Sequence, residues 1–399
     1  MSAVEFKNVD IVFGDNQKDA IPMVDAGKTR DEILAATGCV LGVADGTIKI
    51  EEGEICVLMG LSGSGKSTLL RAVNGLNPVT RGEVLVKDGD TMVDVASCDA
   101  KTLRHMRMER VSMVFQQFAL LPWRTVSENV GLGLELKGMP KAEREAIVEE
   151  KLKMVSLDQW KDKYAHELSG GMQQRVGLAR AFATDADILL MDEPFSALDP
   201  LIRDHLQDEL LELQRNLKKT IIFVSHDLDE ALKIGTHIAI MEGGRIVQYG
   251  EPEEIVLNPA NEYVAEFVAH MNPLNVLRCA SLMTLTEDLK KANDLLILDK
   301  YNAFKVSLGN DGAVSKVIFD DKQDLKLFNF GEENLLSDIG EDNIVMASPD
   351  ITMKRAIELR QATGNPILLV EDNRLVGVVG DEEIYQGILR QSSIADAAQ

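Results

Sequence analysis

The chain has no apolar run that approaches the ~18 residues a helix needs to cross a bilayer, which argues against a membrane-spanning protein. Its first residues, 1–5, carry no basic group ahead of an apolar stretch, so we expect no export signal. Cysteine is scarce, and no two cysteines have the Cys-x-x-Cys spacing; the four are Cys39, Cys56, Cys98 and Cys279. Isolated thiols of this kind are typical of a reducing cytoplasm and do not form a disulfide framework.

The sequence also lacks basic charge. It has 42 Lys and Arg against 65 Asp and Glu, a formal net charge of −23. A strongly acidic protein repels phosphate backbones and anionic headgroups, so we expect neither nucleic acid nor anionic lipid as a direct partner. Contact with a membrane should therefore run through another protein. The length of 399 residues allows two or three domains.

Residues 60–67 have the sequence GLSGSGKS, between an apolar run at 54–59 and an expected helix at 67–73. The run predicts a buried parallel strand. Glycines let the backbone turn tightly so that N–H groups point at an anion, and the following helix N-terminus favours phosphate. Lys66 should reach the β- and γ-phosphates, and the Ser67 hydroxyl should ligate Mg²⁺. Because strand and helix both flank the loop, the pattern favours a nucleoside triphosphate site over a Gly/Ser-rich turn that happens to contain lysine.

Two further apolar runs end in polar residues. Residues 186–191 are followed by Asp192 and Glu193, and residues 221–224 by Ser225 and then His226. Asp192 should hold Mg²⁺, and Glu193 can polarise the attacking water as general base. Adjacent acids are also common where strands end, and a lone histidine is more often structural. The phosphate loop upstream favours the catalytic interpretation.

Residues 168–174, LSGGMQQ, predict the start of a helix that runs to about residue 183, with Ser169 as the N-cap. A serine hydroxyl, bare N–H groups and a helix dipole together make a second anion site. In this order, the GLSGSGKS, LSGGMQQ and ILLMDEP segments resemble the ATP-binding cassette (ABC) family. The resemblance covers about residues 1–250 and implies an α/β cassette: a mixed sheet with a parallel core, and a helical subdomain at about 116–183.

The resemblance also implies roles for individual residues. His226 corresponds to the family's γ-phosphate contact, and Gln116 in VFQQFALLP to the glutamine that contacts Mg²⁺ and water, with Gln117 as the alternative. The signature serine and glycines act on ATP held by a second subunit, and Asp199 lies in a loop that crosses the dimer interface. We therefore expect a homodimer whose ATP is held by Phe13 (stacked on adenine), Gly60, Ser62, Gly63, Gly65, Lys66, Ser67, Thr68, Ser169, Gly170, Gly171 and Asp199. Mg²⁺ is expected at Ser67, Gln116 and Asp192, and catalysis at Glu193, His226 and Gln116.

The sequence predicts a domain boundary near residue 270, with a linker at 271–273, giving domains 1–270 and 271–399. The tail has the order helix (351–359), strand (365–372), strand (374–380), helix (from 381). This order resembles a cystathionine-β-synthase (CBS) repeat, and residues 276–330 are expected to be a degenerate partner repeat. Gly380 and Glu383 stand where nucleotide-binding repeats carry Ser/Thr-x-x-Asp. A packing or dimerisation module is thus at least as well supported as a nucleotide site.

A narrower resemblance rests on the extra segment 26–38, AGKTRDEILAATG, on residues 195–203, FSALDPLIR, and on the CBS-like tail. These features are similar to the ATPase subunit of bacterial importers of quaternary amines (glycine betaine, choline or proline betaine). Such a subunit works on the cytoplasmic face of the inner membrane with permease subunits and, indirectly, a periplasmic substrate-binding protein. It does not touch the substrate, so no residue here selects the amine.

Three alternatives remain open at this point: an importer ATPase for another small polar solute, a soluble non-transport ABC ATPase, and a nucleotide sensor with a vestigial cassette. A single phosphate loop, a single signature and the acidic balance disfavour the second. Intact Lys66, Asp192, Glu193 and His226 disfavour the third.

Overall fold

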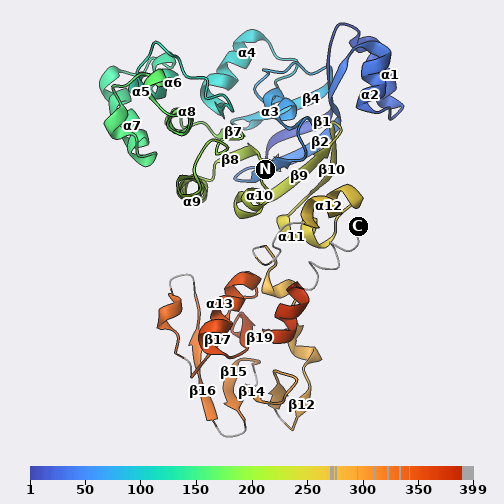
Figure 1. Ribbon diagram of the computed structural model, residues 1–399, viewed down its shortest axis with the longest axis vertical. Helices are drawn as coiled ribbons and strands as arrows, with labels where there is room; N and C mark the ends of the chain where they lie inside the picture. The colour runs from blue at the N-terminus through green and yellow to red at the C-terminus, as the bar shows by residue number, and fades with distance from the viewer. Residues whose placement is uncertain are drawn as a thin grey trace. The chain divides into compact units, whose positions relative to one another are not determined.

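The computed structural model describes residues 1–269, 274, 276–293, 295–309, 311–320, 323–331, 334–340 and 342–388. The chain packs into two units, Met1–Ile255 and Val256–Gln399, coloured from blue to yellow and from yellow to red in Figure 1. The expected linker at 271–273 lies outside the described residues. The boundary between the units falls earlier than the expected position at residue 270, so helix α12 (Glu262–Ala269) belongs to the second unit.

The first unit is built on a six-stranded sheet with a parallel core. The strand order is β10-β9-β3-β8-β7-β6, and only the β9–β10 hairpin at one edge is antiparallel. The central strands are buried on both faces, as all-parallel strands usually are. Their bounds are β3 (Ile55–Met59), β6 (Val111–Val114), β7 (Ile188–Asp192), β8 (Thr220–Val224), β9 (His237–Glu242) and β10 (Arg245–Gly250).

A second, antiparallel sheet shares the apolar core of this unit. Its order is β2-β1-β4-β5, with β1 (Ser2–Phe13), β2 (Val40–Glu51), β4 (Arg81–Asp88) and β5 (Thr91–Asp94). Phe6 on β1 and Leu58 on β3 belong to one cluster of buried side chains, to which α3 (Lys66–Ala72) adds Leu69 and Leu70. Two helices, α1 (Gln17–Asp25) and α2 (Arg30–Thr37), form the connection between β1 and β2.

The expected helical subdomain is present between β6 and β7. Its longest helices, α7 (Lys141–Met154) and α8 (Gly170–Ala183), pack against each other and against the short α5 (Val126–Val130). Ser169 caps α8, as its sequence pattern predicts, by accepting a 3.4 Å hydrogen bond from the Met172 N–H. The remaining helices of the first unit are α4 (Ala100–His105), α6 (Leu132–Leu136), α9 (Pro200–Leu217) and α10 (Leu228–Ile234); α11 (Pro252–Leu257) crosses into the second unit.

The second unit contains a nine-stranded sheet within its described residues, in the order β11-β19-β18-β17-β16-β15-β14-β13-β12. The expected helix–strand–turn–strand–helix order is present: α13 (Met353–Thr363), β18 (Ile367–Glu371), β19 (Arg374–Val379) and a helix at 381–388. The other strands are β11 (Thr284–Leu285), β12 (Lys291–Ala292), β13 (Leu295–Ile297), β14 (Phe304–Leu308), β15 (Val314–Phe319), β16 (Gln323–Asn329) and β17 (Asn343–Ala347).

The expectation of a degenerate CBS repeat at 276–330 is not met. The described residues of this segment contain short 3-10 turns and strands but no α-helix, and β12 to β16 pair with one another as an antiparallel meander. Consecutive strands joined by short turns pair locally and leave no length for a crossover helix. The segment therefore extends the sheet of the second unit, with its own apolar cluster around Val306 and Val317.

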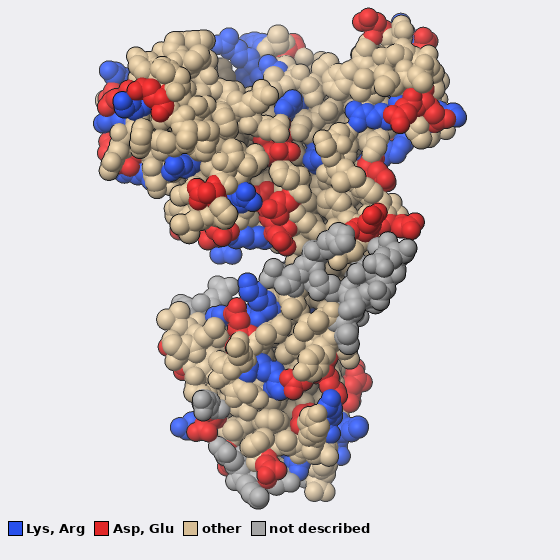
Figure 2. All heavy atoms as spheres, viewed as in Figure 1, with Lys and Arg blue, Asp and Glu red and all other residues tan. Residues whose placement is uncertain are grey.

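Charged side chains of both signs are interspersed over the described surface that Figure 2 shows. Many form exposed ion pairs, such as Lys28 with Glu32 at 2.8 Å and Lys153 with Glu149 at 2.8 Å. Exposed pairs of this kind contribute only about 0–1 kcal/mol each. The fold therefore depends on the apolar clusters inside each unit rather than on its surface charge.

The separation into two units predicts that the first folds alone. The described buried residues of the main apolar cluster in the first unit all lie between Ala3 and Met241. Removing residues 271–399 keeps the first unit whole, together with α11 and α12, and should therefore leave a chain that unfolds cooperatively and binds ATP with the affinity of the full chain. Thermal unfolding and equilibrium dialysis against ATP would check this. A truncated chain that aggregates or binds no ATP would show that the tail is part of the first unit's fold.

Candidate active site

The polar residues expected from the sequence meet at one edge of the six-stranded sheet. Strand β3 ends at Met59, directly before the phosphate loop, and β7 ends at Asp192. Strands β6 and β8 end two residues before Gln116 and His226. Because these strands are parallel neighbours, their carboxyl ends lie along the same edge, which is where open α/β sheets bind ligands.

The phosphate loop forms a narrow turn that only glycine fits at two positions. Gly60 and Gly65 have φ of +138° and +103°, and a side chain on either would overlap a carbonyl oxygen, that of Met241 or of Gly42. Inside the turn, the Lys66 ammonium donates to the carbonyl oxygens of Gly60 at 2.8 Å and Leu61 at 3.0 Å. Burial lowers the pKa of Lys66 below its ordinary value, and the nearby Glu193 and Asp192 carboxylates offset this effect only in part.

Asp192 is fully buried, and two residues of α3 compensate its charge: Ser67 by a hydrogen bond and Arg71 by an ion pair. It accepts a 2.7 Å hydrogen bond from the Ser67 hydroxyl and bonds at 3.2 and 2.7 Å from Nε and Nη2 of Arg71. Our sequence interpretation missed Arg71. A signal was present, because Arg71 lies four residues after Ser67 and so faces the same side of the helix.

Glu193 lies at the centre of a second group. Its Oε2 accepts a 3.0 Å hydrogen bond from Gln116 Nε2 and lies 3.5 Å from His226 Nδ1. Gln116, and not its neighbour Gln117, makes this contact. Glu193 has φ +49°, a conformation that residues with side chains seldom adopt and that is enriched at functional sites. The strand end thus directs the two adjacent carboxylates to different partners.

Gln174 on α8 is a second residue that the sequence did not single out. Its Nε2 donates to the Glu193 carbonyl oxygen at 3.0 Å, and its Oε1 accepts from the Ala197 N–H at 3.0 Å. Gln174 is buried. It therefore joins the signature helix to the loop that carries Glu193, at the position of the second glutamine in LSGGMQQ.

The signature residues and Asp199 do not meet the phosphate loop within one chain. Ser169 and Gly170 are exposed at the start of α8, and a methyl group on Gly171 would lie 3.2 Å from the Ala197 carbonyl oxygen. Asp199 caps α9, accepting from the Ile202 N–H at 3.1 Å. Within the described part of the chain, no hydrogen bond or ion pair links these four residues to Gly60 or to residues 62–68. One chain therefore presents two separate parts of the expected site.

Phe13, the expected adenine contact, ends β1 and is 37% exposed. A methyl group on Gly42 would lie 2.9 Å from Cε2 of its ring and 2.9 Å from Cγ2 of Thr68. The exposed ring and the start of α3 thus flank the same glycine. A planar apolar surface is thereby placed next to the phosphate loop.

The loop is suited to a phosphorylated ligand. The Ser64 hydroxyl oxygen is buried and has no hydrogen-bond partner among the described residues. The two obligatory glycines let the turn pack closely against the carbonyl oxygens of Met241 and Gly42, and α3 begins directly after it, at Lys66. Ser62, Gly63, Ser67 and Thr68 complete this loop, which can donate backbone N–H groups to an anion.

The sequence of the chain is similar to those of known ATP-binding transport proteins. Residues 43–196 match the family model described as ABC transporter. The chain is 48% identical over 320 residues to the glycine betaine transport ATP-binding protein OpuAA of Bacillus subtilis (strain 168), covering 80% of this chain and 74% of that protein. It is 41% identical over 394 residues to the glycine betaine/carnitine transport ATP-binding protein GbuA of Listeria monocytogenes, covering 95% and 96%.

Among solved structures, the dimeric post-hydrolysis state of the ATP-binding cassette MJ0796, bound to ADP and phosphate, is similar with a TM-score of 0.54 and 31% identity. It covers 62% of this chain and 98% of that one. The expected fold class, an α/β cassette followed by a further domain, is therefore confirmed. The chain belongs to the ABC transporter family and is an ATP-hydrolysing subunit of that family.

Proposed function

We propose that this chain powers the import of a quaternary amine, glycine betaine or choline, through membrane permease subunits. The observation that carries the proposal is the similarity to GbuA, a glycine betaine/carnitine transport protein, over nearly the whole of both chains. That match covers 95% of this chain, whereas the match to the MJ0796 cassette covers 62% of it.

The proposed chemistry is hydrolysis of ATP by an activated water. ATP bound with Mg²⁺ supplies the phosphoryl group, and Ser67, Asp192 and Gln116 are the proposed Mg²⁺ contacts. Glu193 is the proposed base that accepts a proton from the water. The hydrogen bond from Gln116 holds its carboxylate in place at the edge of the sheet. His226 Nδ1 lies 3.5 Å from the same oxygen of Glu193, and His226 is the proposed γ-phosphate contact.

Two copies of the chain are proposed to form the complete site. The exposed start of α8, with Ser169, Gly170 and Gly171, supplies a helix N-terminus and a hydroxyl to ATP held on the partner's phosphate loop. Asp199 crosses the interface, and Phe13 stacks on adenine. The separation of these residues from the phosphate loop within one chain supports this arrangement, as does the dimeric state of MJ0796.

The remaining partners follow from the proposed transport role. Within the described residues, no helix combines the length and apolar character that crossing a membrane requires. We propose that the chain binds permease subunits on the cytoplasmic face of the inner membrane. A periplasmic protein would supply the amine, holding its trimethylammonium group in an aromatic cage by cation–π contact.

The tail is proposed as a CBS-like packing or dimerisation module of residues 271–399. Glu383 is 7% exposed and accepts a 2.7 Å hydrogen bond from the Gly380 N–H and a further one from the Thr284 hydroxyl. A carboxylate occupied in this way is not free to bind a ribose. This favours a packing role for the tail over a nucleotide site.

Replacing Glu193 with glutamine should preserve ATP binding and abolish turnover. The amide keeps the size of the side chain but cannot accept the proton, and losing one such group costs on the order of 10²–10⁴ in rate. Steady-state ATPase assays and equilibrium dialysis would measure the two effects. Glu83→Gln, an exposed change on β4, is the matched control. Near-normal turnover in Glu193→Gln would remove Glu193 from the mechanism.

Replacing Arg71 with methionine should destabilise the nucleotide-free chain. The change keeps the apolar stem but leaves the buried Asp192 carboxylate without its cation, at a cost of about 1–3 kcal/mol in the free energy of unfolding. The same change in an Asp192→Asn background should cost less, because no charge is then stranded. Urea unfolding of the four chains measures this difference. If Arg71→Met lowered the free energy of unfolding equally in both backgrounds, Arg71 would not stabilise the chain through its pair with Asp192.

A strain that lacks this gene should lose high-affinity uptake of radiolabelled choline or glycine betaine and keep uptake of amino acids and sugars. The wild-type gene should restore uptake, and the Glu193→Gln gene should not, because transport requires hydrolysis. Unchanged uptake of both amines, with loss of an unrelated solute, would overturn the substrate assignment and leave the ATPase activity untouched.

A further inference from the structure

The inserted helices α1 and α2 lie beside the proposed nucleotide site. They connect Phe13, the last residue of β1, to Val40, the first residue of β2, and these two residues pair across the strands. The insertion therefore leaves and re-enters the sheet at its Phe13 end. Gly42 is the third residue of β2, and a methyl group on it would lie 2.9 Å from the ring of Phe13 and 2.9 Å from the side chain of Thr68.

The insertion is packed firmly against the sheet rather than extended from it. It has its own apolar cluster with the ends of β1 and β2, made of Val12, Ala20, Val24, Ile33, Cys39, Leu41 and Ala44. Ala20 and Ile33 are fully buried. A helix pair held by such a cluster keeps the residues on its surface at defined positions.

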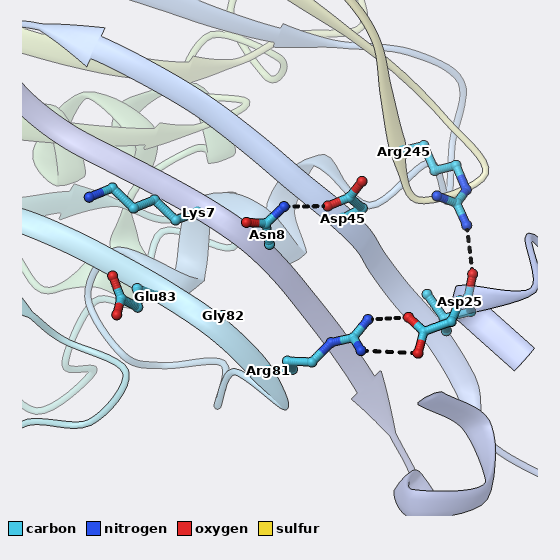
Figure 3. A pocket seen from close by; sticks show the side chains of 9 residues that line it. Lys7, Asn8, Asp25, Asp45, Arg81, Gly82, Glu83 and Arg245 are labelled. Carbon is cyan, nitrogen blue, oxygen red and sulfur yellow. Dashed lines mark hydrogen bonds and ion pairs between the residues drawn. The ribbon is translucent and has the colours of Figure 1, made fainter. Parts of the chain in front are cut away.

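Polar contacts fix the end of α1 as well (Figure 3). Arg81 on β4 makes a bidentate pair with Asp25, at 2.5 and 3.1 Å, and a 2.6 Å bond to the buried Asp10. Arg245 on β10 donates to the Val24 carbonyl oxygen at 3.2 Å. A hollow of about 730 Å³ lies here, but its Arg81 guanidinium is already bound by two carboxylates. The arginines that line the hollow therefore hold the end of α1 in place, and the hollow is not an anion site.

At its other end the insertion reaches the phosphate loop. Arg30 is the first residue of α2, held in place by the Thr29–Glu32 capping box. Its Nη1 donates a hydrogen bond to the carbonyl oxygen of Gly63, and a methyl group on Gly63 would lie 3.6 Å from the same nitrogen. Gly63 has φ +81° and stands in the middle of the loop. The insertion thus braces the loop from outside.

The charge of Arg30 is not neutralised by a carboxylate. Lys28, two residues earlier, is paired with Glu32 at 2.8 Å, and the Lys28 contact and the Thr29 N–H lower the pKa of Glu32 to about 2. Arg30 has no ion pair within the described residues, in a chain with a net charge of −23. A guanidinium has five N–H donors, and Nη1 uses one of them on Gly63.

We propose that Arg30 is a positioning residue for ATP binding, which holds the Gly63 peptide of the phosphate loop and adds a free positive charge beside it. A loop held in one conformation loses less entropy when the ligand binds, and an unpaired guanidinium attracts the triphosphate. The proposal rests on the assignment of residues 60–68 as the ATP phosphate site. It gives the inserted helices a role in nucleotide affinity.

The test compares three variants of the full chain. Arg30→Met removes the charge and the donor, and should raise the dissociation constant for MgATP and the KM about 3- to 10-fold, the range for losing one partly exposed charged hydrogen bond. The kcat at saturating ATP should stay within about twofold, because the catalytic carboxylate is untouched. Arg30→Lys keeps the charge and a donor and should recover most of the affinity. Lys28→Met removes an equal charge from the same turn without touching the loop and should leave the affinity unchanged.

The outcomes separate this proposal from the assignment of the phosphate site. If the wild-type chain binds no MgATP, or if Lys66→Ala binds it normally, the phosphate-site assignment fails and the Arg30 proposal fails with it. If both behave as expected but Arg30→Met binds MgATP like wild type, only the role of Arg30 is overturned. The same holds if Lys28→Met loses as much affinity as Arg30→Met, or if Arg30→Met lowers kcat at unchanged affinity. Thermal unfolding without nucleotide should show the same midpoint for Arg30→Met and wild type, and a lost transition would refute the positioning role.

Discussion

Parallel pairing of four neighbouring strands is the constraint on which the rest of the first unit depends. In-register hydrogen bonds join β6 to β7, β7 to β8 and β8 to β3, so that Val114 pairs with Met191 and Asp192 with Val224. Parallel strands must run in the same direction, so all four carboxyl ends lie at one edge. The phosphate loop, Gln116 and His226 are thereby brought to Asp192 and Glu193. A shift of one residue in any pair would turn a site side chain towards the opposite face.

Burial of Asp192 imposes the next requirement. A fully buried carboxylate is costly unless hydrogen bonds and a countercharge compensate it. Ser67 and Arg71, one turn apart on α3, supply both. The same contacts hold the first turn of α3 against β7 and so fix the base of the phosphate loop. Glu193, whose backbone has positive φ, directs its carboxylate away from this cluster to Gln116 and His226.

Under the proposed function, the site is divided between two copies of the chain, and this division would couple hydrolysis to assembly. Within one chain, Gln174 bonds the signature helix to the loop after β7. Ser169, at the start of the same helix, remains exposed. Under the proposed function, ATP closes the gap by joining two copies. The inserted helices contact the same loop through the hydrogen bond from Arg30 to Gly63. Nucleotide affinity and dimer closure would then depend on different elements around one loop.

The sequence by itself determined the features that rest on local chemistry. Glycine at positions 60 and 65, the apolar run before them and the Ser169 cap each depend on a few adjacent residues, and the structure has the expected loop, strand and helix. The helix–strand–turn–strand–helix order near the end of the chain was predictable for the same reason, whereas the fold class followed from the resemblance of three motifs to a known family. Only the tertiary structure decided which distant groups meet, because those contacts depend on strand order and packing. The Arg71–Asp192 pair and the Arg30–Gly63 bond join residues that no local pattern connects. The antiparallel meander of β12 to β16 and the boundary after Ile255 were likewise set by long-range pairing, which a linear pattern of helices and strands does not contain.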